Sequence, residues 1–329
     1  MAHPQHTSSL TSLEEALTVL FCLIDDAYTT LNPRGAYRYE TLKHLSDSEV
    51  IALALFQQLR GVESERSFLR DAERFFSHLF PGVVGLYPSS FNRRVKKLRR
   101  FLELLRREIL PELVGEPETL LVDSTLLSVL HPRQVKQSAG WGSPSAGAAW
   151  VRWGSFSVYG VKLHLICATN RIPLSYELTP ANVADICLTE ELINEAALGD
   201  GVARKLLGDL AYSSEELRAA LAEVGILLAT ERAERRRGVR QHIEITLSSL
   251  KRVFGLGETL ATTLTGLATR IAAKIAAYTP TASTSTGCWG ALKVASRSYG
   301  HEPDNRHLVA RNRLPGPTSR AAPALLASR

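Results

Sequence analysis

At 329 residues the chain is long enough for two folded units, since single domains commonly have about 100 to 200 residues. Its 45% hydrophobic and 22% charged content is typical of a globular protein. No apolar run approaches the ~20 residues that span a bilayer, and the N-terminus lacks the pattern of a signal peptide. These features favour a cytoplasmic protein over a membrane or secreted one.

The net charge of +6 favours a polyanionic partner, but the charge is unevenly distributed. Seven Lys or Arg and two acids follow Pro280, so the rest of the chain is close to neutral and local clusters matter more than the sum. The four cysteines are scattered, without a CxxC pair or neighbouring histidines, and predict reduced thiols rather than a zinc site.

The first hundred residues are predicted to be helical. Ser46 and Glu49 form a capping box directly ahead of the apolar run IALALF, which marks the start of one helix. We therefore expect an N-terminal all-α domain over residues 1–115. Its helices are predicted over Leu13–Leu31, from Ser46, over Glu65–His78 and from just after Pro88.

The exposed face of the fourth helix is predicted to be strongly basic. Two interpretations fit: the stripe lies along DNA phosphates, as in a helix-turn-helix, or it is an ordinary solvated helix face. No aromatic, Asn or Gln side chains are interleaved with it, so it predicts backbone contact and no base readout. The stripe consists of Arg93, Arg94, Lys96, Lys97, Arg99, Arg100, Arg106 and Arg107.

From Glu118 onward the pattern changes to strands that alternate with helices. TLLVDSTLLSV, SVYGVKLHLICAT, IPLSYEL, KLLGDLAY and GILLAT are predicted strands. Helices are expected after Pro180 to Ala197, from Ser214 to Glu223 and over about Val239–Phe254. Three consecutive strands followed by this alternation predict an α/β fold with a mixed five-stranded sheet flanked by helices.

A last apolar helix is expected over about Leu260–Tyr278, which places the second domain at residues 116–280. Beyond Pro280, TPTASTSTG leads into a Pro-, Arg- and Ser-rich sequence without sustained periodicity. Residues 281–329 are therefore predicted to form a largely disordered tail.

The stretch Gln137–Gly154 is predicted to be a long loop containing three tryptophans, Trp141, Trp150 and Trp153. Two interpretations fit these side chains. They anchor the loop to the domain, or they stack on an unpaired base.

Two acids stand at unusual places in the predicted strands. Asp123 interrupts an apolar strand and Asp209 ends another, and a buried carboxylate is costly unless it is paired or binds a metal. For either acid alone, a turn-capping role is the simpler interpretation. A third acid, Glu244, changes the balance. It lies on the helix RGVRQHIEITLSSLKRVFGL, on one face with Arg240 and Lys251.

These residues together resemble the DDE transposases of bacterial insertion sequences, whose catalytic domain has a ribonuclease-H-like fold. In that family the first Asp lies on the first strand, the second follows the fourth strand and the Glu lies on the closing helix. Asp123, Asp209 and Glu244 match these places. Arg240, Glu244 and Lys251 match the R-x3-E-x6-K signature, while Arg237 replaces the Tyr that often precedes it.

Further matches are YGVKLHL with Lys162 and His164, LTPANVAD with Asn182 and Asp185, and GDLAY with Tyr212. The last departs from the usual GDKGY. The resemblance covers about residues 40–280, and the combination of motifs is more specific than any single acid.

The resemblance implies a metal-dependent endonuclease and strand transferase that cuts transposon ends and joins the released 3′-OH to target DNA. Asp123 would bridge two Mg²⁺ or Mn²⁺ ions, and Asp209 and Glu244 would each complete one site. Lys162, Arg240 and Lys251 would contact DNA, as would the basic stripe. Expected partners are double-stranded DNA at transposon ends and target, and at least one further protomer. A bacterial, nucleoid-associated location when bound to DNA is also implied.

Two alternatives remain open. One is a structure-specific nuclease with the same fold and ions, and the other is a catalytically silent DNA-binding protein that descends from a transposase. Dinucleotide-binding and P-loop enzymes are disfavoured because neither GxGxxG nor GxxxxGK[ST] occurs.

Overall fold

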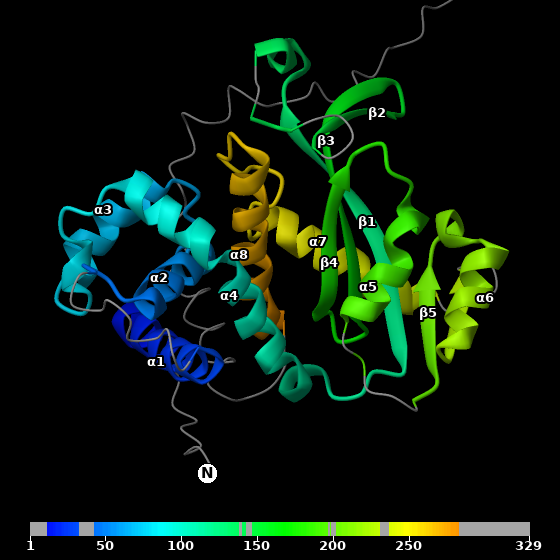
Figure 1. Cartoon of the computed structure of the whole chain (residues 1–329), viewed down its shortest axis with the longest axis horizontal. Helices are drawn as coiled ribbons and strands as arrows, with labels where there is room; N and C mark the ends of the chain where they lie inside the picture. Colours follow the sequence, from blue (N-terminus) through cyan, green and yellow to red (C-terminus); the bar gives the residue numbers. More distant parts are fainter. Residues whose placement is uncertain are drawn as a thin grey trace, which may run out of the picture.

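The computed structural model describes residues 12–32, 43–137, 140–142, 147–196, 198, 202–230 and 237–282. Figure 1 shows a helical part, in blue and cyan, beside a sheet with its own helices, in green and yellow. The tail predicted to be disordered lies outside the described residues from position 283 onward. Within the described ranges, no helix is long and apolar enough to cross a bilayer.

The four N-terminal helices begin close to their predicted positions. They are α1 (Leu13–Leu31), α2 (Asp47–Leu59), α3 (Glu65–Phe76) and α4 (Pro88–Val114). The capping box ahead of α2 is confirmed: Ser46 Oγ accepts a hydrogen bond from Glu49 N at 3.0 Å, and Glu49 Oε2 accepts one from Ser46 N at 2.5 Å. These bonds satisfy backbone donors that the first helical turn leaves unpaired.

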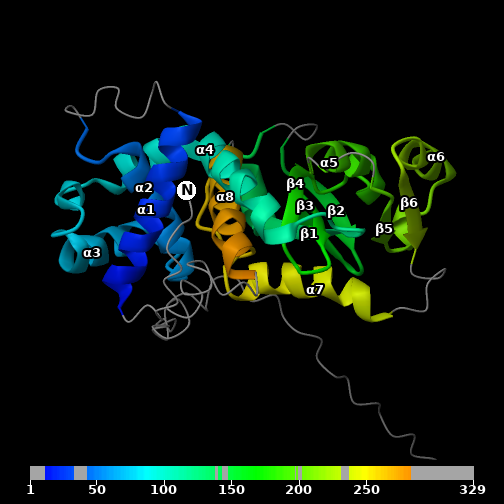
Figure 2. The same ribbon diagram turned by 90° about the horizontal axis from the view of Figure 1, so that it is seen from below.

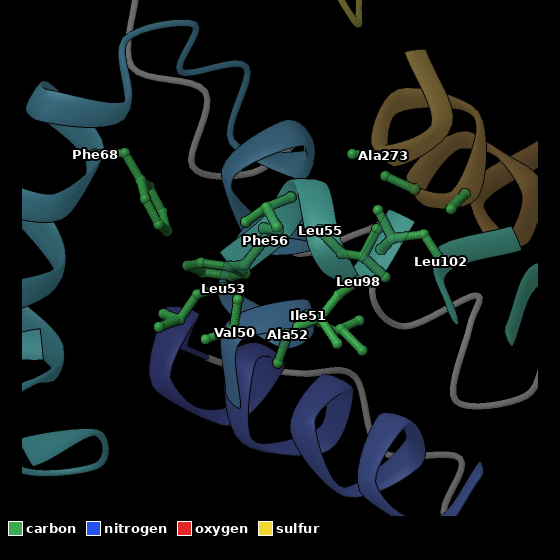
Figure 3. Packing of buried hydrophobic residues seen from close by; sticks show 14 of the residues in the cluster. Val50, Ile51, Ala52, Leu53, Leu55, Phe56, Phe68, Leu98, Leu102 and Ala273 are labelled. Atoms are coloured by element: carbon green, nitrogen blue, oxygen red, sulfur yellow. The ribbon is translucent and has the colours of Figure 1, made fainter. Parts of the chain in front are cut away.

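α2 forms the centre of the helical part because it is apolar on nearly all sides. Val50 through Phe56 are all buried, and Figure 3 shows them packed between α1, α4 and α8. α8 (Leu264–Ala282) comes from the end of the described chain, four residues beyond the predicted end at Tyr278. The helical part is therefore completed by a helix that follows the sheet in the sequence.

The sheet has the expected mixed architecture. β1 (Thr119–Leu130), β3 (Phe156–Ala168) and β4 (Pro173–Pro180) are antiparallel neighbours, and β5 (Arg204–Gly208) and β6 (Ile226–Thr230) follow on the other side of β1, parallel to it. The order is β4-β3-β1-β5-β6. The prediction of an α/β fold with a mixed sheet flanked by helices is confirmed.

The number of strands was predicted wrongly, because the sheet has six strands and not five. The additional strand, β2 (Ala149–Trp153), lies in the stretch predicted to be a loop. It pairs antiparallel with the start of β3. β1 pairs with one edge of β3, so β2 lies along the opposite edge, which β4 occupies farther along the strand. Five residues beside a Gly- and Ser-rich segment give too weak an alternation to predict a strand.

Helices cover both faces of the sheet, as Figure 2 shows. α5 (Thr189–Glu195) and α6 (Glu215–Glu223) pack on one face, and α7 (Arg237–Arg252) packs on the other. The helix expected up to Ala197 is divided into a 3-10 turn, Asp185–Leu188, and the short α5.

The two parts of the molecule share a continuous hydrophobic core. Leu53 of α2 and Val161 of β3 belong to the same cluster of buried side chains, which spans the expected domain boundary near residue 115. Arg106 on α4 was predicted to be exposed, and this is wrong: it is 1% exposed and donates to the carbonyls of Pro173 and Leu174 at 2.6 and 2.9 Å. Its guanidinium therefore joins α4 to β4.

Candidate active site

Asp123 lies in the middle of β1, on the face that α7 covers. It pairs with Leu165 of β3 and follows Leu121 by two residues, so the three side chains share one face of the sheet. Its side chain is 19% exposed, and its Oδ1 accepts a hydrogen bond from Ser124 N at 2.8 Å. A carboxylate is thus held at the border between the apolar core and solvent.

Asp209 follows the last residue of β5 on the neighbouring strand. Leu121 pairs with Leu207 in the parallel register, so Asp123 and Asp209, each two residues farther on, lie level with one another. Asp209 Oδ1 accepts a hydrogen bond from Ala211 N at 2.8 Å and caps the short turn Leu210–Tyr212. The turn-capping role is therefore present, and it fixes the carboxylate beside β1.

Glu244 projects from α7 toward the same region. Arg240, one turn earlier, brings the two elements together: its Nη2 lies 3.7 Å from Glu244 Oε1 and 3.8 Å from Asp123 Oδ2. The Glu244 side chain is 54% exposed, whereas Ile243 and Leu247 on the adjoining stripe are buried against β1, β3 and β5. α7 thus presents an acid at the rim of its buried face.

Two polar contacts hold α7 against the turn between β3 and β4. His242 Nδ1 contacts the Thr169 carbonyl, and Thr246 Oγ1 lies 3.2 Å from the Arg171 carbonyl while it also lies 2.9 Å from the His242 carbonyl of its own helix. Because Glu244 lies between His242 and Thr246 in the sequence, this turn sets its distance from the sheet.

The electrostatics of Asp123 reflect all three acids. Burial raises its pKa to about 6; the hydrogen bond from Ser124 and the charge of Arg240 oppose this, and the charges of Asp209 and Glu244 add to it. Desolvation also lowers the pKa of Lys251, which the charge of Asp123 partly offsets. The structure therefore brings Asp123, Asp209, Glu244, Arg240 and Lys251 into one electrostatic neighbourhood.

Tyr212, three residues after Asp209, packs into the buried cluster on the other face of the sheet. Its side chain is buried, and its ring packs so closely on Gly208 that a Cβ there would lie 2.9 Å from Tyr212 Cδ2. Burial raises the pKa of Tyr212, and the negative charges of Asp185, Asp123 and Asp209 raise it further. The phenol therefore stays protonated beside the carboxylates.

Lys162 lies on the opposite face of the sheet from Asp123. Alternation along β1 puts Ser124 on the opposite face from Asp123, and Lys162 shares that face because it pairs with Leu126. Its Nζ lies 2.7 Å from Asp185 Oδ1, the same oxygen that accepts a hydrogen bond from Ser124 Oγ at 2.7 Å. The charge of Lys162 is thus engaged inside the protein.

The sequence matched Asp185 to a motif and predicted Lys162 as a DNA contact, and the contacts of Asp185 with both Lys162 and Ser124 were not predicted. The signal was present in the strand alternation, because Ser124 and Lys162 both fall on the face opposite Asp123. His164 lies on that face too, with Nε2 2.8 Å from Thr179 Oγ1. Burial, followed by the charge of Lys162, lowers its pKa to about 4, so it is neutral at pH 7.

The residues of the basic stripe differ in their availability. Arg94 is engaged, since its guanidinium donates to the Leu45 carbonyl at 2.7 Å and to Asp47 at 2.5 Å. Arg107 is half-buried and pairs with Glu103 and Glu195, and Lys96 is half-buried. The exposed members are Arg93, Lys97, Arg99 and Arg100.

The three acids suit hard divalent cations by chemistry, because carboxylate oxygens are the ligands that Mg²⁺ and Mn²⁺ prefer. A cation among them would relieve the repulsion that adds to burial in raising the pKa of Asp123. As the side chains lie, no three His, Cys, Asp or Glu of the described part of the chain are arranged to hold a metal ion. Arg240 Nη2 lies within 4 Å of both Asp123 and Glu244, and the Glu244 side chain is 54% exposed.

Comparison with known proteins gives a family match. Residues 115–279, which are 165 of the 329, match the family described as the transposase DDE domain. This range contains all three acids. No curated protein matches the sequence.

Two solved structures are similar over part of the chain. The piggyBac transposase synaptic complex with hairpin DNA has a TM-score of 0.31 and 13% identity, covering 68% of this chain and 50% of that one. The Mos1 strand transfer complex has a TM-score of 0.23 and 15% identity, covering 67% and 78%. The chain thus spans half the length of the piggyBac chain.

Proposed function

The chain belongs to the transposase DDE domain family, and on that premise we propose that it cuts DNA at the ends of an insertion sequence and joins the released 3′-OH to target DNA. The observation that carries this proposal is the convergence of Asp123, Asp209 and Glu244 from β1, β5 and α7. The proposed catalytic residues are these three acids.

The family generally uses divalent metal ions, and we propose that Mg²⁺ or Mn²⁺, two ions per site, is held by the same three carboxylates. Asp123 is the proposed bridging ligand, because the charges of both other acids act on it. When bound, such a pair of ions supplies charge stabilisation to the attacking and the leaving oxygen of an in-line displacement. Glu244 is the ligand that must move, since Arg240 stands between it and Asp123.

The cations beside the trio have a proposed role in binding the DNA backbone. Arg240 Nη2 lies 3.8 Å from Asp123 Oδ2, and Lys251 is near enough that the charge of Asp123 partly offsets the desolvation that lowers its pKa, so both cations would face a phosphodiester placed at the acids. Arginine suits phosphate because its guanidinium donates two parallel hydrogen bonds. Neither step of the proposed reaction needs a covalent bond between protein and DNA.

The partner proposed for this site is double-stranded DNA, both as transposon end and as target. The exposed members of the α4 stripe, Arg93, Lys97, Arg99 and Arg100, are proposed to contact the backbone away from the cut. Pairing two ends in one complex would require at least two protomers, so a dimer or larger assembly on DNA is part of the proposal.

The test is to incubate the purified chain and the DNA that flanks its own gene with Mg²⁺ or Mn²⁺, and to map the products. Cut ends bearing 3′-OH groups together with joined products are expected. Cutting without joining would support a structure-specific nuclease instead. DNA binding without any cutting would support a catalytically silent protein that descends from a transposase.

A further inference from the structure

One segment of the chain carries no negative charge. Between Asp123 and Glu177 there is no Asp or Glu, whereas the whole chain has 33 in 329 residues, so these 53 positions would be expected to hold about five. The same stretch contains five cations, Arg133, Lys136, Arg152, Lys162 and Arg171. Such an imbalance suits a surface that faces a polyanion.

This segment includes the hairpin of β2 and the start of β3, which lies at the upper end of the sheet in Figure 1. Trp150 pairs with Tyr159 across the hairpin, and Arg152 pairs with Ser157. Partners in an antiparallel pair share a face, and so do alternate residues. Trp150, Tyr159 and Arg152 therefore form one surface.

Trp150 on this surface has no packing role like that of Trp141. Trp141 is 2% exposed and anchors the segment to the core, whereas Trp150 is 46% exposed. The ring of Trp150 leans on that of Tyr159, with centroids 5.4 Å apart and an angle of 58°, which holds it in place while its outer face stays open. Arg152 is exposed as well, and its one described contact is a 3.4 Å hydrogen bond to the Gly154 carbonyl. The side chain of Trp153 lies outside the described residues.

The hairpin surface lies on the same face of the sheet as the candidate active site. Tyr159 and Leu165 are six residues apart on β3 and so point to one face, and Leu165 pairs with Asp123. At about 3.3 Å per residue, six residues correspond to roughly 20 Å. That length equals about six base pairs of a duplex, at about 3.4 Å each.

We propose that Trp150, Tyr159 and Arg152 form a second DNA-contact surface, which holds the substrate about six base pairs from the phosphodiester at the three acids. The open face of Trp150 packs against a base or deoxyribose, and Arg152 pairs with a phosphate. This inference rests on the proposed function, since it takes the same DNA as its ligand. It concerns binding alone and includes no chemical step.

The experiment measures the affinity of the full chain for fluorescently labelled duplexes that contain the cut site and are shortened from each end in turn. Asp123→Asn protein is used as the background, so that binding is measured without cutting. In that background the affinity is expected to fall when one arm becomes shorter than about six base pairs. Adding Trp150→Ala is expected to weaken binding of the long duplex roughly tenfold and to leave the trimmed duplex unaffected.

Matched variants separate contact from folding. Trp150→Phe keeps an aromatic face and is expected to retain most of the affinity, while Phe75→Ala removes another exposed ring, on α3, and is expected to change nothing. Arg152→Ala is expected to reduce the slope of log affinity against log salt by about one. Arg218→Ala on α6 is the control and is expected to leave this slope unchanged, because Arg218 already pairs with Glu215.

The proposed hairpin contact would be overturned if adding Trp150→Ala to the Asp123→Asn protein left its affinity for every duplex unchanged. It would also be overturned if the affinity fell by the same factor at every duplex length. The proposed function fails separately, if the wild-type chain binds these duplexes but does not cut them. In that case a length-dependent loss in Trp150→Ala would still support the surface as a DNA contact.

Discussion

Arg240 Nη2 lies 3.8 Å from Asp123 Oδ2, so the arginine of α7 stands where a cation would meet the acid of β1. The same nitrogen lies 3.7 Å from Glu244 Oε1. One guanidinium thus neutralises part of the charge that the folded chain concentrates at this place. Under the proposed function, binding of a metal ion by Asp123 and Glu244 would require this guanidinium to move, so Arg240 would compete with the metal before it contacts phosphate.

Replacing Arg240 should therefore strengthen metal binding while it weakens catalysis. In Arg240→Gln, Mn²⁺ affinity without DNA is expected to increase roughly three- to tenfold, because two weak ion pairs no longer have to be broken. Titration of Mn²⁺ followed by electron paramagnetic resonance measures this. Arg252→Gln, at the end of the same helix, is the control and should leave the affinity unchanged. Weaker Mn²⁺ binding by Arg240→Gln would contradict the competition.

Asp123 should make the protein less stable at neutral pH than its amide variant. Its pKa is about 6 in the folded chain and 3.8 ordinarily, so between these values the folded state holds more protons than the unfolded state. The free energy of unfolding then falls as pH rises through this window. Asp123→Asn removes the effect and should stabilise the chain at pH 8 by roughly 1 to 3 kcal/mol.

Urea unfolding of both proteins at pH 4 and pH 8 measures this difference. The gain in Asp123→Asn should be present at pH 8 and largely absent at pH 4. A variant that is less stable than the wild-type chain at pH 8 would show that the carboxylate is already compensated without metal.

Lys162 should matter for stability more than for DNA. Its ammonium forms an ion pair with Asp185. Burial alone would raise the pKa of Asp185, but the hydrogen bonds from Lys162 and Ser124 outweigh it and lower that pKa. Lys162→Met leaves that partly buried carboxylate without its cation, which should cost about 1 to 3 kcal/mol of unfolding free energy. DNA affinity should change less than in Arg100→Ala, which removes an exposed cation of α4. The reverse order would support the prediction that Lys162 contacts DNA.

The turn that holds α7 contains a strained residue, since Arg171 has φ 72°. Glycine adopts this backbone conformation without the steric cost, and a β-branched residue does so only with difficulty. Arg171→Gly should leave the free energy of unfolding unchanged or raise it by up to about 1 kcal/mol, whereas Arg171→Val should lower it by more than about 1 kcal/mol. Chemical denaturation of the two variants measures these changes. A lower free energy of unfolding in Arg171→Gly would mean that the Arg171 side chain itself stabilises the fold.

The choice of the three acids could be predicted from the sequence, because each acid stands out from the apolar pattern of its own strand or helix. An acid inside an apolar strand, an acid at a strand end and an acid beside an apolar helix stripe were enough to select Asp123, Asp209 and Glu244. The parallel register of β1 and β5 then brings the first two level. The position of Arg240 between Asp123 and Glu244 depends on how α7 lies on the sheet, and no local pattern contains that.

Arg106 shows where charge misled the interpretation. It lies four residues after Leu102 and four before Leu110, so helical spacing alone places it in the buried stripe of α4. Its partners, the carbonyls of Pro173 and Leu174, lie more than sixty residues away and give no local signal. The boundary at residue 115 stays a prediction, although the core runs across it.

The most direct test of the shared role of the three acids is metal-dependent cutting of the flanking DNA by Asp123→Asn, Asp209→Asn and Glu244→Gln. Glu223→Gln, an exposed acid on α6, serves as the matched control. Each of the three variants should bind this DNA as the wild-type chain does and should lose cutting by at least about a thousandfold, while the control cuts normally. Retained cutting by any one of the three would contradict the account.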